Sequence, residues 1–327
     1  MAIDVLSDVL RVFRLSARVY LHASFCGAWA VDVADHKKAP FHVIVQGSCW
    51  LHFPDRRAPV ALGAGDLVVF PHDTPHVLAD SPQPPGPQVP RNQPASGIVE
   101  GPFTTLVCGD FGIERRSWNP LLEALPEVIV ARHDDTANAR HLDALLRLIV
   151  AEAGSDEPGG KAVVDKLAET LFVLVVRTHL RQQRAETGYL AALVDPRVGK
   201  TLQALHENPE RKWIVEDLAR VAGQSRSAFA DRFQRLVGIA PLQYLTHWRM
   251  RRAHEWLATG TDSVARIAER CGYGSEAAFA KVFKRHIGIG PGAARRHALR
   301  SSAPGVRPAQ DEKLLLDRQN RSRQEPL

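Results

Sequence analysis

Two stretches of the C-terminal third decide the fold: LARVAGQSRSAFADRFQRLVGIAP at residues 218–241 and IAERCGYGSEAAFAKVFKRHIGIGP at residues 267–291. They are copies of one pattern, with one residue inserted in the second copy. In each copy an Ala, a Gly, a Ser, a pair of Phe and a closing Gly and Pro follow one another in the same order. This self-similarity predicts that the two segments fold alike.

Each recurrent residue suits one step of a helix-turn-helix unit. Gly223 and Gly272 supply the left-handed backbone that a turn needs, and Ser225 and Ser275 are typical N-caps of a second helix. The paired aromatics share one face of that helix, because they lie four residues apart: Phe229, Phe233, Phe279, Phe283. The alternative, a hairpin repeat that binds protein, is disfavoured because solenoids stack three or more similar units.

Charge is distributed unevenly along the 327 residues. The region 195–300 holds 19 Lys and Arg against 10 Asp and Glu, an excess of +9, whereas the whole chain carries +6. Basic charge is therefore concentrated beside the repeat, which is the footprint expected of a phosphate-binding region.

The first third has a different pattern. Short β-branched or aromatic runs separated by Gly and Pro predict strands from about residue 18 to 112, as in a small barrel or sandwich. Two interruptions are expected, DRRAPVALGAGD at 55–66 and the Pro-rich loop at 81–94. Helical periodicity follows at 137–154 and 161–184, and the second helix has enough apolar faces to pack on the barrel and on a second subunit.

On these residues, the region 195–300 resembles the DNA-binding domain of AraC/XylS-type transcription regulators along its full length. The resemblance implies that the helix at 241–259 links the two units. Their second helices would then enter successive major-groove segments about 34 Å apart on one face of DNA.

The family pattern also implies which side chains face DNA. In the first unit Ser227, Ala230 and Asp231 occupy groove-facing positions, although Asp231 departs from the Arg or Gln common there and could instead pair with Arg235. In the second unit Lys281 reads a base or contacts a phosphate. The full set of expected DNA contacts is Ser225, Arg226, Ser227, Ala228, Ala230, Asp231, Arg232, Ser275, Glu276, Ala277, Lys281, Lys284 and Arg285, with Arg295 and Arg296 as further phosphate contacts.

The segment 22–112 resembles a cupin of the kind that serves one AraC subgroup as a sensor. GDLVVFPHDTPH at 65–76 fits the second cupin motif, except that Asp73 replaces a Gly. The first motif is degraded, with His42 alone. Either His42 and His76 hold a metal, with or without His22 or His36, or they are ordinary barrel histidines; no cofactor is otherwise expected.

Cysteines suggest a second sensor chemistry. Cys26 and Cys108 lie where the reactive-chlorine-sensing subgroup of these regulators has cysteines, which implies redox sensing. That role requires an exposed thiolate of low pKa. The alternative is that Cys108 is a buried strand residue. Cys49 and Cys271 are expected to be inert.

The sequence thus predicts an α+β chain in four parts: a cupin-like β-barrel sensor at 1–115, a helical dimerisation and linker segment at 116–190, an all-α AraC-type DNA-binding domain with two helix-turn-helix units at 195–300, and a disordered tail at 301–327.

The expected function is sequence-specific transcription regulation, as an activator, in response to a small molecule or oxidant. Its alternatives are a metal-dependent cupin enzyme fused to a DNA-binding domain, and a constitutive DNA binder whose barrel serves only dimerisation. Expected partners are promoter DNA, the effector, RNA polymerase and a second copy of the chain. With neither a signal peptide nor a membrane span in the sequence, we expect a non-enzymatic, cytoplasmic protein.

Overall fold

The computed structural model describes residues 4–13, 15–33, 38–55, 57–95, 101–112, 118–133, 139–155, 157–182 and 188–302. The chain divides into two compact parts. The larger part comprises the residues up to Asn208 together with Trp213–Thr246. The smaller part comprises Pro209–Lys212 and the chain from His247 onward. The expected tail falls outside the described residues, apart from positions 301 and 302.

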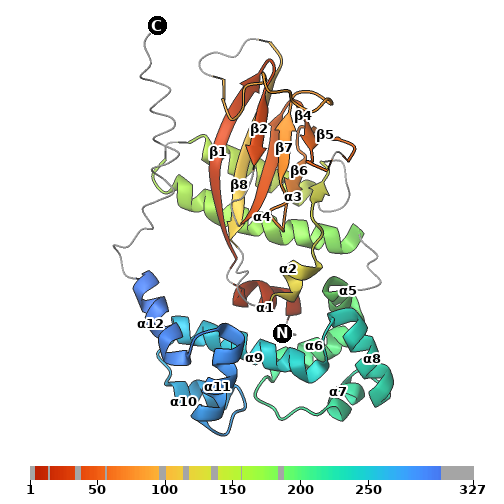
Figure 1. Ribbon diagram of the computed structural model, residues 1–327, viewed down its shortest axis with the longest axis vertical. Coiled ribbons are helices and arrows are strands. Elements are labelled where there is room, and N and C mark those ends of the chain that lie inside the picture. The colour runs from red at the N-terminus through yellow and green to blue at the C-terminus, as the bar shows by residue number, and fades with distance from the viewer. Residues whose placement is uncertain are drawn as a thin grey trace. The chain divides into compact units, whose positions relative to one another are not determined.

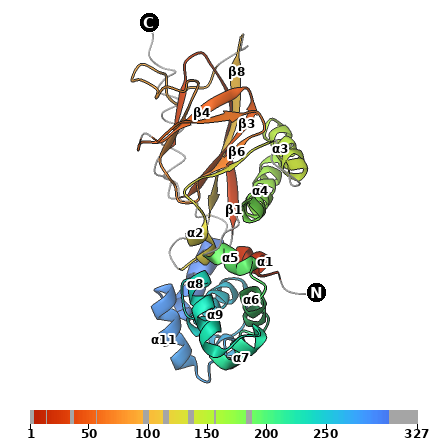
Figure 2. The same cartoon turned by 90° about the vertical axis from the view of Figure 1, so that its right-hand side faces the viewer.

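The larger part contains a barrel of two antiparallel sheets (Figures 1 and 2). One sheet has the order β1-β8-β3-β6-β9 and the other the order β2-β7-β4-β5. The strands are β1 Ser16–Cys26, β2 Ala30–Val33, β3 Ala39–Gln46, β4 Ser48–His52, β5 Val60–Gly63, β6 Leu67–Val69, β7 His76–Ala79, β8 Phe103–Gly112 and β9 Ile129–Ala131. The sequence-based expectation of a small β-barrel is confirmed.

Two strands lie where the sequence did not predict them. β5 forms inside the expected interruption at 55–66, because Leu62 reaches the barrel core although Gly and Pro flank it. β9 falls in the segment 116–190, which was expected to be helical. It pairs antiparallel with β6, with Ala131 opposite Leu67. Three apolar residues are too short a run to distinguish a strand from a helix by periodicity.

Strand register decides which side chains enter the barrel. Leu21, Cys108, His42, Val68 and Val130 lie opposite one another across β1, β8, β3, β6 and β9. Because side chains alternate along a strand, this row projects to one face. The apolar residues of this row belong to the barrel core or pack against it. His42, which is in the same row and fully buried, therefore lies inside the barrel.

Two helices cover the other face of the larger sheet, α3 Ala139–Ala153 and α4 Gly160–Gln182 (Figure 2). They lie close to the ranges expected from periodicity. Phe172 of α4 packs edge-on against Phe111 of β8, with ring centroids 4.9 Å apart, and Phe111 stacks on Phe41 of β3. α4 therefore buries its apolar face on the sheet, as its sequence predicts.

The rest of the larger part is helical. α1 Val5–Val12 and α2 Pro120–Ala124 are followed by α5 Tyr189–Val194, α6 Val198–Glu207, α7 Val215–Val221 and α8 Arg226–Val237. α1 contacts α6, and α2 contacts α5. The first helix-turn-helix, α7 and α8, thus belongs to the same compact part as the barrel.

The helix α9 Pro241–Thr259 begins in the larger part and ends in the smaller one, where α10 Val264–Arg270, α11 Glu276–Ile287 and α12 Pro291–Ser302 follow. Met250, Leu257, Ile267, Phe279 and Phe283 form the core of the smaller part. Within the described residues, no helix is both long enough and apolar enough to cross a membrane.

Candidate DNA-binding surface and sensor barrel

The second helix of the first helix-turn-helix, α8, forms as its sequence dictates. The Ser225 hydroxyl caps it by accepting the backbone N–H of Ala228 at 3.4 Å, and Gly238 ends it in a left-handed conformation at φ +85°. Gly223 holds the preceding turn at φ +62°. Phe229 and Phe233 are fully buried, so the opposite face of α8 is left to solvent.

Most expected DNA contacts of α8 lie on that exposed face. Ser225, Arg226, Ser227, Ala228 and Asp231 are exposed, whereas Ala230 and Arg232 are half-buried. In the described part of the chain, Asp231 makes no ion pair with Arg235.

Both expected arginine contacts of α8 are paired with carboxylates that the sequence did not point out. Arg226 Nε lies 3.1 Å from Glu216 of α7, and both side chains are exposed. Arg232 donates from Nε to Asp195 Oδ2 at 3.1 Å, and its second nitrogen contacts the same oxygen. Arg232 therefore braces α8 against the start of α6.

Asp195 is held by several donors. Its Oδ1 accepts the backbone N–H groups of Arg197 at 3.0 Å and Val198 at 2.8 Å, where α6 begins. Burial raises the pKa of Asp195, but the bonds from Arg232 and from these N–H groups outweigh burial and hold the pKa below its ordinary value. Asp195 is ionised at neutral pH.

The second helix-turn-helix repeats the capping with different charge. Ser275 caps α11 by accepting the N–H of Ala278 at 3.2 Å, and Gly288 ends it at φ +88°. Gly272 has φ +76°, and a Cβ there would lie 2.6 Å from the carbonyl oxygen of Glu210, so both conformation and space require glycine.

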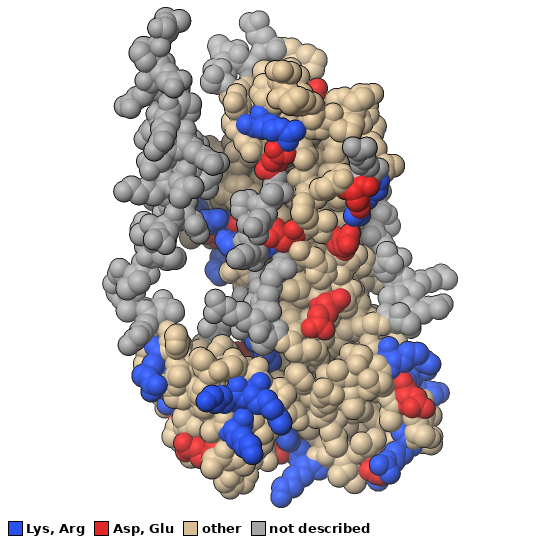
Figure 3. Space-filling model, viewed as in Figure 1, with Lys and Arg blue, Asp and Glu red and all other residues tan. Residues whose placement is uncertain are grey.

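The exposed face of α11 is the more basic of the two. The expected contacts on it are all exposed: Ser275, Glu276, Ala277, Lys281, Lys284, Arg285. None of the three basic side chains has a carboxylate partner in the part of the chain that the structure describes, in contrast to Arg226 and Arg232 of α8. Figure 3 shows many Lys and Arg side chains, in blue, on the surface of the C-terminal helices. Of the two expected phosphate contacts on α12, Arg296 is exposed, but Arg295 donates to the carbonyl oxygen of Asp262.

In the barrel, His42 and His76 lie side by side. Their Nε2 atoms are 2.8 Å apart, His76 Nδ1 is 2.7 Å from the Thr74 carbonyl oxygen, and Phe70 stacks on the His76 ring. Both histidines are buried. Asp73, which replaces the motif's Gly, has φ +59°, a conformation that Asp tolerates better than most residues.

This pair does not make a metal site by itself. No group of three or more His, Cys, Asp or Glu side chains able to hold a metal occurs among the described residues. His22 lies opposite Val107, one position away from the Leu21–Cys108 pair, so its side chain projects to the other face of the sheet, near Gly154. His36 lies outside the described residues. A hydrogen-bonded pair of barrel histidines fits this geometry.

The two cysteines of the redox hypothesis lie apart. Cys26 is exposed at the end of β1, opposite Phe103, whereas Cys108 is buried and lies opposite Leu21 of β1. Cys26 is five positions along β1 from Leu21, which is roughly 16 Å. A disulfide needs Cα atoms within about 7 Å, so this fold keeps the two thiols from bonding.

The remaining thiols are buried. Cys49 shares the barrel core with Cys108, and burial raises the pKa of Cys108 well above its ordinary value and that of Cys49 to about 12. In the smaller part, burial raises the pKa of Cys271 to about 12. At neutral pH these three thiols are protonated, the unreactive form.

A β-barrel joined to two capped helix-turn-helix units, each with an exposed face on its second helix, defines a DNA-binding regulator with its own sensor domain. Residues 4–181 match the family described as "Cupin", and residues 218–297 match "Helix-turn-helix domain". The chain belongs to the AraC-like transcription regulators that carry an N-terminal cupin.

Several relatives align with most of this chain. An AraC-like transcription regulator of Streptomyces lividans is 35% identical over 90% of this chain and 98% of its own. The RCS-specific transcriptional activator RclR of Escherichia coli is 31% identical over 81% of this chain and 86% of its own. Among solved structures, the DNA-binding domain of AdpA in complex with a target DNA is 33% identical, covers 34% of this chain and all of that one, and has a TM-score of 0.32.

Proposed function

We propose that this transcription regulator binds promoter DNA as a homodimer through both helix-turn-helix units and changes transcription when its barrel meets a small molecule or an oxidant. The observation that carries the DNA-binding role is the exposed face of α11, with Lys281, Lys284 and Arg285 free of carboxylate partners among the described residues. Its further partner in this proposal is RNA polymerase. The location is the cytoplasm, the compartment that holds promoter DNA.

We assign unequal tasks to the two units. Lys281 contacts a base or a phosphate, and Lys284 and Arg285 contact phosphates, so α11 supplies most of the electrostatic attraction. On α8, Ser227, Ala230 and Asp231 face the groove with small or acidic side chains. The first unit therefore contributes less charge and reads bases by close approach.

The test begins with a duplex selected from a random pool by the wild-type protein. Lys281→Ala is expected to weaken binding about 5–30-fold, within the 1–2 kcal/mol typical of one charged contact, and to lower the salt slope by about 1. Arg91→Ala, which removes an exposed cation of the barrel paired with Asp32, is the control and leaves affinity unchanged. Equal affinities and equal salt slopes for both variants would refute the groove assignment.

We further propose that an oxidant meets Cys26 first. Cys26 is the exposed thiol of the four, and the relative RclR is named as RCS-specific. Oxidation that also reaches Cys108 requires β1 to shift or open, because Cys108 is buried in the barrel core. In this proposal, the shift of β1 is how oxidation of the thiols changes the structure of the barrel sheet.

The redox proposal is tested by promoter binding before and after mild oxidant in wild type, Cys26→Ser and Cys108→Ser. We expect Cys26→Ser to lose the response and Cys49→Ser, the buried control, to keep it. A response of wild-type size in Cys26→Ser would overturn the proposal and leave a non-covalent effector as the signal.

We propose no enzymatic activity. The barrel interior offers one hydrogen-bonded histidine pair, His42 and His76, and a third ligand is absent from the described residues. Catalytic metal sites in proteins use three or more side-chain ligands, so we derive no metal-dependent step.

A further inference from the structure

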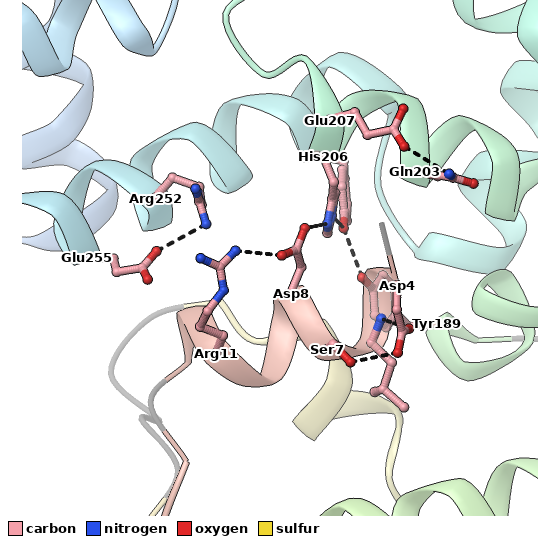
Figure 4. A network of polar contacts seen from close by, with 12 residues as sticks. Asp4, Ser7, Asp8, Arg11, Tyr189, Gln203, His206, Glu207, Arg252 and Glu255 are labelled. Carbon is pink, nitrogen blue, oxygen red and sulfur yellow. Dashed lines mark hydrogen bonds and ion pairs between the residues drawn. The ribbon is translucent and has the colours of Figure 1, made fainter. Parts of the chain in front are cut away.

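A buried polar network joins the N-terminal helix to the first helix-turn-helix (Figure 4). Oδ2 of Asp8 on α1 lies 3.5 Å from Nδ1 of His206 on α6. Nε2 of His206 lies 2.7 Å from the hydroxyl of Tyr244 on α9, which lies 2.9 Å from the hydroxyl of Tyr189 on α5. Four helices that are separate in sequence are thus joined by three polar contacts.

The network is shielded from water. The His206 side chain is 0% exposed and the Asp8 side chain 14%, and both tyrosines are buried. The His206 and Tyr189 rings each stack on Tyr244, and the rings of Trp118 and of Phe233 on α8 pack edge-on against it. The polar chain therefore runs directly beside the core of the first helix-turn-helix.

Asp8 sets the direction of the hydrogen bonds. Burial raises the pKa of Asp8, but the interactions with His206 and Arg11 outweigh burial and hold it below its ordinary value. A carboxylate only accepts, so His206 presents Nδ1–H to Asp8. In a neutral ring Nε2 then accepts the Tyr244 O–H, and the Tyr244 oxygen accepts from Tyr189.

The C-terminal end of α1 lines a cavity that it shares with α4, the helix on the barrel sheet. Leu10 and Phe13 line a small apolar cavity together with Leu122 of α2 and Phe172 of α4. Phe172 packs edge-on against Phe111 of the barrel strand β8. The C-terminal end of α1 thus lines one cavity together with Phe172 of α4, and α1 also contacts α6.

We propose that Asp8 is a positioning residue for DNA binding, which holds the first helix-turn-helix on α1 through His206 and Tyr244 and makes α1 the element that couples the barrel to this unit. A shift of the sheet at Phe111 moves Phe172 and α1. Because Asp8 fixes α1 to α6, the same shift reorients the helix core that carries α8. The sensor and the first unit therefore respond together.

The test uses the full chain and the duplex selected by wild type. Asp8→Asn keeps the shape of the side chain but removes the charged acceptor, and we expect affinity for the duplex to fall about 5–10-fold, as for loss of one buried charge-assisted bond. Glu207→Gln is the matched control, since it makes the same charge change on α6 at an exposed residue bonded to Gln203. Asp8→Glu restores part of the affinity.

A double variant separates positioning from general damage. Tyr244→Phe removes only a hydroxyl of the same network, so Asp8→Asn with Tyr244→Phe is expected to be little worse than the poorer single variant. In the free protein, hydrogen exchange in Asp8→Asn rises about 5–10-fold in α1 and α6 and stays unchanged in the barrel strands.

Three results would overturn the inference: Asp8→Asn behaving as Glu207→Gln does, fully additive losses in the double variant, or faster exchange throughout the barrel. If wild type bound no duplex at all, the DNA-binding role itself would fail, and the exchange measurement on the free protein would still decide whether Asp8 couples α1 to α6.

Discussion

Removing the Asp195 side chain is predicted to loosen the first helix-turn-helix at the start of α6. Asp195 accepts two backbone N–H groups there and pairs with Arg232 of α8. An acceptor at a helix start is worth about 1 kcal/mol, and a half-exposed ion pair adds about 0.5–1 kcal/mol. Asp195→Ala should therefore cost about 2 kcal/mol, and Asp195→Asn, which keeps an acceptor, about 0.5–1 kcal/mol.

Hydrogen exchange of the α6 and α8 amides measures these costs locally. A loss of about 2 kcal/mol speeds exchange about 30-fold, and a loss of 0.5–1 kcal/mol about 2–5-fold. Glu216→Gln is the control, because its ion pair with Arg226 is exposed on both sides, and it should change exchange less than about 2-fold.

The comparison of the two Asp195 variants decides the reasoning. If Asp195→Asn sped exchange as much as Asp195→Ala, the ion pair with Arg232, and not the bonds to the backbone N–H groups of α6, would account for most of the stability that Asp195 contributes. If neither variant changed exchange, the contacts of Asp195 would not hold α6. The pKa of Asp195 is lowered in the fold, so its contribution is complete above about pH 4 and is lost as pH falls through the lowered value.

Three further outcomes are expected. Burial and the neighbouring His286 lower the pKa of His247 to about 4, so the unfolded chain binds more protons than the folded chain between about pH 4 and 6.5. As pH falls through that window, the free energy of unfolding of the smaller part should decrease by about 1–2 kcal/mol, measured by urea unfolding, and His247→Gln should weaken this pH dependence. Leu148→Glu and Val163→Glu alter apolar residues of α3 and α4 that are 46% and 42% exposed; if these helices form the proposed dimer interface, sedimentation will detect monomers, whereas dimers of wild-type stability would place the interface elsewhere. Phe283→Ala empties a fully buried site of the smaller part and should cost about 3–5 kcal/mol, read as a lower urea midpoint; an unchanged midpoint would contradict the core assignment.

Local chemistry was enough to predict the two helix-turn-helix units. The caps at Ser225 and Ser275 and the positive φ angles of Gly223 and Gly272 depend on residues within a few positions of one another, so the sequence pattern contains them. The expected barrel follows from the same kind of local alternation, and its short strands β5 and β9 escaped because three or four residues carry too little periodicity.

The site was predicted less completely, because its partners come from distant parts of the chain. Nothing in the sequence near Arg232 points to Asp195, which is 37 positions away. The separation of Cys26 from Cys108 depends on strand register, and the neighbourhood of His42 and His76 depends on how two sheets face each other. A resemblance identifies such residues but gives neither their distance nor their burial.

The sequence by itself determined that this chain carries two helix-turn-helix units and a cupin, because repeats, helix caps and strand alternation depend on residues that are close together in the sequence. Tertiary structure alone decided that α11 presents its basic side chains without carboxylate partners while α8 pairs two of its arginines with Glu216 and Asp195. It also decided that Asp8 meets His206, nearly two hundred positions away. Packing sets those contacts, because only the folded chain brings such residues within reach of a hydrogen bond.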